Sequence, residues 1–155
     1  MARRLDRTDF RILAELQNDA RLSNKELAAK VGLAPSSCLE RVRRLQAEGA
    51  LRGFHAEVDP AALGIELQAL IAVRLRRHSR DLYEGFRTHL MSLAEMVAVY
   101  HLAGANDFLV HVAVRDVEQL RNLVLDAFTT RPEVGHVETA LVFEHARGRV
   151  LPDYT

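Results

Sequence analysis

The segment from Ser23 to Phe54 (SNKELAAKVGLAPSSCLERVRRLQAEGALRGF) constrains the fold more than any other part of this chain. Ser23, with Glu26 three residues later, forms a capping box that starts a helix, and apolar residues then recur at helical spacing. Gly32 stands where a left-handed C-terminal cap ends that helix, and Pro35 suits the first turn of the next one. Two helices joined by so tight a turn predict a helix-turn-helix.

Another helix is predicted before this segment, from Thr8 to Asn18, with Asp6 or Thr8 as its cap. The three helices indicate one compact domain over residues 1–53. The extended pattern of residues 51–58 can supply a strand, which would make the domain a winged helix-turn-helix. Asp59-Pro60 marks a turn within a linker that we place at residues 54–65.

The third helix has an outer side rich in groups that bind DNA. At 100° per residue, Cys38, Val42 and Leu45 fall on the opposite, buried side. The outer side is centred on Ser36, Ser37, Glu40 and Arg44, with Arg41 and Arg43 at its margins. Arginine grips guanine edges or phosphates, and serines at a helix N-terminus donate to phosphates. These six residues are therefore our candidate contacts to double-stranded DNA; the alternative is a solvated face on which Glu40 pairs with Arg44.

The remainder of the chain alternates between strand and helix periods. We expect strands at 68–75, 97–102, 108–114 and 137–143, and helices at 82–90 and 117–130. This β-α-β-β-α-β order predicts a ferredoxin-like domain over residues 66–150 and hence an α+β protein, with a tail at 151–155. Leu109 and Ala113 give the third strand a second apolar face, so we expect homodimers that pair through the sheet.

The bulk composition argues for a specific rather than a general binder of nucleic acid. The 155 residues carry 21 Lys/Arg and 21 Asp/Glu, and thus no net charge. Cys38 is the only cysteine, which excludes an intrachain disulfide, and the longest apolar runs have strand length. Without a signal-peptide pattern, we expect a cytoplasmic protein with no membrane contact. The seven histidines show no metal-ligand spacing, and we predict neither a metal nor a cofactor.

Five segments resemble the leucine-responsive regulator/AsnC (feast–famine) family of bacterial and archaeal transcription factors. They are LDRTDFRIL (5–13), the helix-turn-helix segment (23–54), VDPAALG (58–64), HLAGANDFLV (101–110) and the stretch from Pro132 to Glu144. The resemblance implies a sequence-specific transcriptional regulator whose ferredoxin-like domain binds an amino acid or a related metabolite. It also implies homodimers that assemble further, into tetramers or octamers, with the effector adjusting assembly or DNA affinity.

The resemblance places the effector pocket at the loop between the second and third strands and on the last strand. By position, its residues are Leu102, Gly104, Ala105, Asp107, Thr139, Ala140 and Leu141. Loop amides can receive an α-carboxylate, and a carboxylate with a hydroxyl can hold the ammonium. Two positions depart from the family pattern: Val137 replaces the first threonine of a Thr-x-Thr pair, and Ala34 replaces a capping serine. From composition alone, residues 104–107 are also consistent with a simple turn.

Two other functions fit parts of the sequence. Sirohaem decarboxylases resemble this family in both domains and use His and Arg in the effector domain, where this chain has His101, His111 and Arg115. Such an enzyme has no use for the serines and arginines on the third helix, so we predict that the protein is not an enzyme and has no catalytic residues. An architectural DNA-wrapping protein is disfavoured by the absence of net positive charge.

Overall fold

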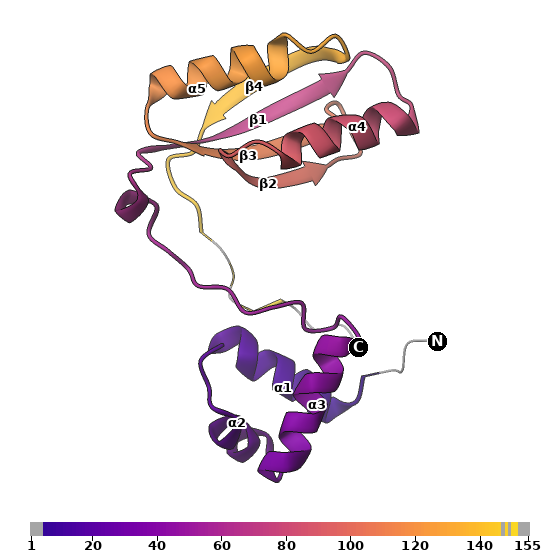
Figure 1. The fold of residues 1–155 in the computed structure, drawn as a ribbon, viewed down its shortest axis with the longest axis vertical. Helices are drawn as coiled ribbons and strands as arrows, with labels where there is room; N and C mark the ends of the chain where they lie inside the picture. Colours follow the sequence, from indigo (N-terminus) through magenta and orange to yellow (C-terminus); the bar gives the residue numbers. More distant parts are fainter. Residues whose placement is uncertain (1–4, 147, 149, 152–155) are drawn as a thin grey trace. The chain divides into compact units, whose positions relative to one another are not determined.

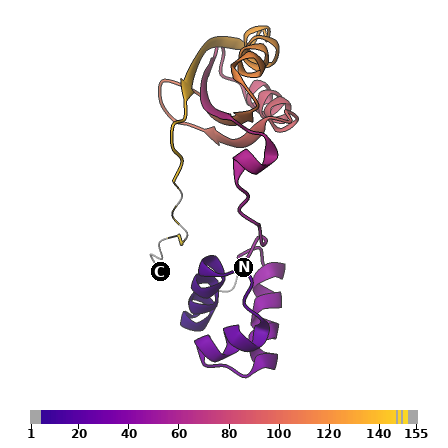
Figure 2. The same ribbon diagram turned by 90° about the vertical axis from the view of Figure 1, so that its left-hand side faces the viewer.

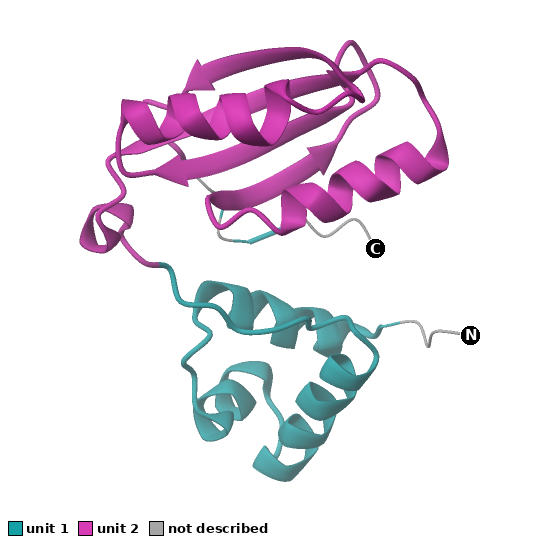
Figure 3. Ribbon diagram, turned by 45° about the horizontal axis from the view of Figure 1, so that its top comes forward, with its two compact units in different colours: residues 1–57, 146–155 teal, residues 58–145 magenta. Residues whose placement is uncertain are grey.

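The computed structural model of this chain describes residues 5–146, 148, 150 and 151, and Figure 1 shows the fold. The described residues divide into two compact units, one within residues 1–57 and 146–155 and the other spanning residues 58–145 (Figure 3). The division falls inside the predicted linker. Ala146 and Leu151 belong with the helical unit, where the Leu151 N–H donates to Gln17 Oε1 at 2.9 Å, whereas the sequence analysis assigned residues up to 150 to the second domain.

The helical unit contains α1 (Arg7–Asn18), α2 (Asn24–Val31) and α3 (Pro35–Ala47). Asp6, rather than Thr8, caps α1, and its side chain accepts the backbone N–H groups of Thr8 and Asp9. The predicted capping box of α2 and the left-handed cap at Gly32, with φ 73°, are both present. The core of this unit consists of Ile12, Leu16, Leu27, Ala28, Val31, Cys38 and Leu45.

The expected wing is absent from the described part of this unit. Between α3 and Pro60 the chain forms no strand, and a 3₁₀ helix follows at Pro60–Leu63. Leu51 packs against the helical core, and its N–H donates to the Leu45 carbonyl at 3.0 Å. Residues 52–59 are exposed and meet no second strand, so their extended backbone has no ladder to join. The prediction of a winged domain was therefore wrong at this point.

The second unit is the predicted βαββαβ domain. Its elements are β1 (Leu67–Leu75), α4 (Arg80–Met91), β2 (Met96–His101), β3 (Phe108–Val114), α5 (Val117–Val124) and β4 (Val134–Leu141). The four strands pair antiparallel in the order β2-β3-β1-β4, and both helices lie on one face of the sheet (Figure 2). Phe86, Phe108 and Phe128 are the largest fully buried side chains between helices and sheet. The fold class is thus α+β, as predicted.

Beside shifts of one or two residues in β1, α4 and β2, two elements of this unit differ more strongly from the expected ones. The predicted helix at 117–130 is α-helical only to Val124 and continues as a π-helical turn from Leu125 to Thr129. The last strand begins at Val134 and ends at Leu141, instead of spanning 137–143. A register shift between Arg74 and Leu75 brings Leu75 opposite Val134, which extends the β1–β4 pairing past the predicted start.

Candidate DNA-binding surface and effector loop

Helix α3 is anchored by one side and leaves the other open. Cys38 and Leu45 are fully buried in the helical core, and Leu39 on the flank is 38% exposed. Of the six candidate DNA contacts, four are exposed: Ser36, Ser37, Glu40 and Arg43. None of these four makes a side-chain hydrogen bond or ion pair to a residue that the structure describes. Serine, glutamate and arginine side chains on an open helix face are of the kinds that contact phosphates and base edges in a DNA major groove.

The other two candidates, Arg41 and Arg44, are bound by carboxylates of α1 and its cap. Arg41 Nη1 lies 2.7 Å from Asp6 Oδ2 and 2.8 Å from Asp9 Oδ1. Arg44 Nη2 lies 2.7 Å from the same Asp9 oxygen, so the Glu40–Arg44 pairing that the sequence allowed is replaced by a pairing across helices. The hydrogen bonds from Arg41 and from the Asp9 N–H lower the pKa of Asp6 to about 2.

The N-terminus of α3 lacks a side-chain cap. Ala34 has the extended backbone of an N-cap residue, with φ −67° and ψ 145°, but offers no acceptor. Pro35 has no N–H, so the first orphan donors are the amides of Ser36 and Ser37. Neither serine hydroxyl replaces the missing cap.

Ala34→Ser is accordingly expected to stabilise the helical unit by about 1 kcal/mol, because the new hydroxyl can accept one of these amides in an unchanged backbone. For a unit of this size the melting temperature rises by roughly 4–8 °C. The measurement is thermal unfolding of the full chain followed by circular dichroism. Ala29→Ser, the same change at an exposed interior position of α2, is the control and is expected to lower stability slightly.

In the second unit, Asp107 joins the loop between β2 and β3 to β1 and α4. Asp107 is 7% exposed, with Oδ2 accepting the Leu75 N–H at 2.7 Å and Oδ1 accepting the Tyr83 hydroxyl at 2.6 Å. His78 Nδ1 lies 3.3 Å from Oδ1. Burial raises the pKa of Asp107, but the two hydrogen bonds and the nearby histidines outweigh it, and the pKa lies below its usual value.

Within one chain, the predicted effector residues form two separate groups. Leu102, Gly104 and Ala105 are exposed on the β2–β3 loop, and Asp107 is buried beneath it. Thr139, Ala140 and Leu141 lie on β4, at the other edge of the sheet. Strand β1 lies between β3 and β4, so two strand spacings, about 10 Å, separate the groups across the sheet. They are also offset along it, because Val73 is opposite Phe108 whereas Thr139 is opposite Ile71.

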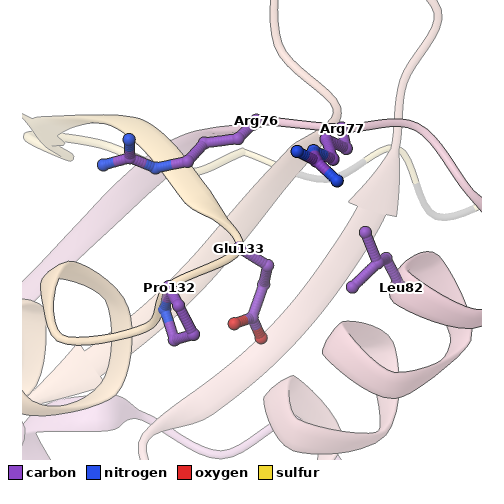
Figure 4. A pocket seen from close by; sticks show the side chains of 5 residues that line it. All are labelled: Arg76, Arg77, Leu82, Pro132 and Glu133. Atoms are coloured by element: carbon purple, nitrogen blue, oxygen red, sulfur yellow. The ribbon is translucent and has the colours of Figure 1, made fainter.

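A cavity of about 450 Å³ opens beside the end of β1 and is lined by residues that are not among the predicted site residues: Arg76, Arg77, Leu82, Pro132 and Glu133 (Figure 4). Arg76 extends over β4, where its Nε donates to the Val134 carbonyl at 2.9 Å. The Glu133 carboxylate is paired with Arg131. Arg76 directly follows Leu75, whose N–H donates to Asp107.

Comparison with known families assigns both units. Residues 5–46 match the model of the AsnC-type helix-turn-helix domain, and residues 68–150 match that of the Lrp/AsnC ligand binding domain. The chain belongs to the Lrp/AsnC family. It is therefore a transcriptional regulator of the helix-turn-helix type that binds DNA through its N-terminal unit and carries a ligand-binding domain.

Curated proteins and solved structures of the Lrp/AsnC family resemble the chain over nearly its full length. HTH-type transcriptional regulator AldR of Mycolicibacterium smegmatis is 47% identical over 95% of this chain and 86% of its own. Leucine-responsive regulatory protein of Escherichia coli is 37% identical over 92% and 87%. The Neisseria meningitidis transcriptional regulator NMB0573, in complex with L-Met, superposes with a TM-score of 0.85 at 31% identity, covering 94% of each chain.

These relatives are regulators and not enzymes, so the sirohaem-decarboxylase interpretation is set aside. The two histidines that suggested an enzyme pack against aromatic rings or are hydrogen-bonded within the fold. His101 packs against Tyr83 and Phe108, and His111 is hydrogen-bonded to Gln68 at 2.8 Å. In the described part of the chain, no three His, Cys, Asp or Glu side chains are grouped as metal ligands would be, and no helix has the length and apolarity to cross a membrane.

Proposed function

We propose that this Lrp/AsnC regulator recognises a specific operator through the open face of α3 and changes its DNA affinity or assembly when an amino acid binds to the second unit. The observation that carries the proposal is the exposure of Ser36, Ser37, Glu40 and Arg43 on a helix whose opposite side is fixed in the core. Arg43 supplies the cation for a guanine edge or a phosphate, and the two serines donate to phosphates. Such a protein works in the cytoplasm, where its DNA lies.

The amino-acid effector is proposed from the family of the second unit and from the L-Met complex of a relative that is 31% identical. Leu102, Gly104 and Ala105 form one half of the proposed site and Thr139 to Leu141 the other. Because the two halves lie apart in one chain, we infer that the loop of one copy and the last strand of another approach each other in the assembly.

The assembly itself is proposed to begin with a dimer formed through the sheet face that carries no helix. Leu70, Ala72, Leu109 and Ala113 lie on that face and are only partly buried, and Tyr100 is 52% exposed. An apolar strip across three strands favours pairing with a second copy. Tetramers or octamers then place the effector halves of different dimers together. Light scattering after size-exclusion chromatography measures the number of copies.

The DNA-reading proposal is tested by selecting binding sites from a random-sequence library with the wild-type protein. Arg43→Ala is expected to weaken binding to the selected site about 5- to 100-fold, because a base or phosphate contact is lost, and to weaken binding to a scrambled site less. Arg21→Ala removes an exposed arginine outside α3 and should leave the ratio of the two affinities unchanged. Failure of the wild type to enrich any sequence contradicts the proposal.

The effector proposal is tested by a thermal-shift screen against the common amino acids. A ligand that binds only the folded protein raises its melting temperature as its concentration exceeds the dissociation constant. We expect one amino acid, or a few of similar shape, to stabilise the protein and to change its affinity for the selected DNA. If none does either, the effector is of another class.

A further inference from the structure

Asp9 is a charged residue at a position where α1 otherwise buries apolar side chains. It lies on the same side of the helix as Ile12 and Leu16, three and seven residues on, and only 2% of it is exposed. A carboxylate at such a position costs free energy unless cations and hydrogen bonds compensate it. The three partners of its carboxylate are Arg41, Arg44 and the backbone N–H of Asp6.

Arg41 lies at the margin of the predicted DNA-binding face and Arg44 at its centre. They lie about one turn apart on α3, and one oxygen, Asp9 Oδ1, accepts from both at 2.8 and 2.7 Å. Asp6 adds a second carboxylate to Arg41 at 2.7 Å. Two carboxylates thus neutralise two guanidinium groups, and Arg43 is the one arginine of α3 to which the described residues offer no carboxylate.

The orientation of Arg44 is set by this pairing. Its Nε is buried without an acceptor among the described residues, which is an unfavourable arrangement for a free arginine. The side chains of Arg41 and Arg44 are nevertheless 27% and 28% exposed, so both lie at the surface of the unit. Without the Asp9 carboxylate, Arg44 can turn outward and reach a phosphate beside α3, and Arg41 keeps only its ion pair with Asp6.

We propose that Asp9 determines the DNA specificity of this regulator by withholding Arg41 and Arg44 from the phosphate backbone. The inference rests on the proposed reading of DNA by α3. Phosphate contacts supply most of the affinity for random sequence and carry no sequence information. Holding two arginines in ion pairs therefore lowers non-specific affinity, and it also fixes α3 against α1 so that the open face meets the bases in one orientation.

The test compares wild type with Asp9→Asn, which keeps the side-chain size and removes the charge. On scrambled DNA, the slope of log K against log salt concentration should steepen by about 0.9 for each additional phosphate that the protein neutralises, roughly 1 to 2 in all. Affinity for scrambled DNA near 0.1 M salt then rises by about tenfold for each of these phosphates. Affinity for the selected site changes less, because the freed arginines also release α3 from α1. The ratio of specific to non-specific affinity falls about tenfold or more.

Two control variants separate this role from general charge and from folding. Asp19→Asn makes the same charge change at the exposed C-terminal cap of α1, where the Asp19 side chain accepts the Arg21 N–H, and should leave the slope and the ratio unchanged. Adding Arg41→Gln and Arg44→Gln to Asp9→Asn should return the slope to the wild-type value. An unchanged slope and ratio in a folded Asp9→Asn protein, or equal effects of Asp19→Asn, overturns the inference.

If Asp9→Asn does not fold, the double variant Arg41→Gln/Arg44→Gln decides the question, because glutamine can still donate to Asp9. If Arg41 and Arg44 are withheld from phosphates in the wild type, the double variant should show the same slope of log K against log salt concentration as the wild type. A slope shallower by about 2 means that both arginines clamp phosphates in the wild type, and the inference is wrong. These outcomes presuppose a wild type that enriches one sequence; a wild type that enriches none refutes the proposed function instead.

Discussion

Leu45→Ala is expected to abolish DNA binding at 37 °C while the second unit stays folded. Leu45 is fully buried in the helical core and is the residue that fixes the C-terminal half of α3 to the rest of that unit. Replacing a buried leucine by alanine costs about 2–5 kcal/mol, from lost transfer free energy and from the cavity. A unit of roughly 50 residues has little more stability than that to lose.

The measurement is urea unfolding of the full chain followed by circular dichroism, together with DNA binding at 25 and 37 °C. Leu39→Ala is the matched control, since it makes the same change on the same helix at a side chain that is already 38% exposed. It should cost less than about 1 kcal/mol. The expectation is contradicted if Leu45→Ala abolishes the unfolding transition of the second unit as well as that of the helical unit. It is also contradicted if the variant binds DNA as tightly as the wild type.

The features predicted correctly are those with short-range signals. Ser23 and Glu26 cap one another across three residues, and Gly32 ends α2 because its own backbone permits a positive φ. The alternation along β1 agrees with its observed burial, whereas β3 departs from a strict alternation at His111, which is buried on the other face. Each of these signals lies within one element, so no knowledge of the tertiary structure is needed.

The side chains at the two candidate sites have partners far away in the sequence. A helical wheel of α3 places Arg44 at the centre of the outer side, but Asp9, 35 residues earlier, binds it. The sequence around Asp107 is typical of a turn, yet its partners Leu75 and Tyr83 precede it by 32 and 24 residues. One signal for Asp9 was present: an acidic residue three and seven positions before the buried Ile12 and Leu16. The sequence around Tyr83 carried no comparable sign of its hydrogen bond to Asp107.

Asp107→Asn is expected to destabilise the second unit by about 1.5–3 kcal/mol at pH 7, because each carboxylate oxygen of Asp107 accepts one hydrogen bond and an uncharged amide has only one oxygen to accept either of them. Tyr83→Phe removes only one of these bonds and should cost about 1 kcal/mol. The measurement is urea unfolding of both variants and the wild type at pH 7, 5 and 3.

The pH dependence distinguishes a charge effect from a packing effect. The pKa of Asp107 is lower in the folded protein than the ordinary value of 3.8, so its ionised form stabilises the fold. That stabilisation is complete above the ordinary pKa and is lost as the pH falls through the lower pKa of the folded state. The difference between wild type and Asp107→Asn should therefore shrink toward pH 3 and below. If the difference in unfolding free energy between wild type and Asp107→Asn stays constant from pH 7 to pH 3, the loss of stability is due to packing.

The same two variants decide how Asp107 acts on the effector, with the amino acid that gives the largest thermal shift as the probe. A carboxylate that binds the effector ammonium directly is needed in itself, so Asp107→Asn abolishes binding and Tyr83→Phe leaves it intact. A carboxylate that supports the loop from beneath acts through its partners, so both variants weaken binding by similar factors. Both Asp107 oxygens already accept protein donors and the residue is 7% exposed, and we therefore expect similar factors. A loss above about 100-fold confined to Asp107→Asn makes it a direct ligand, because a contact worth that much is a charge-assisted bond to the effector itself.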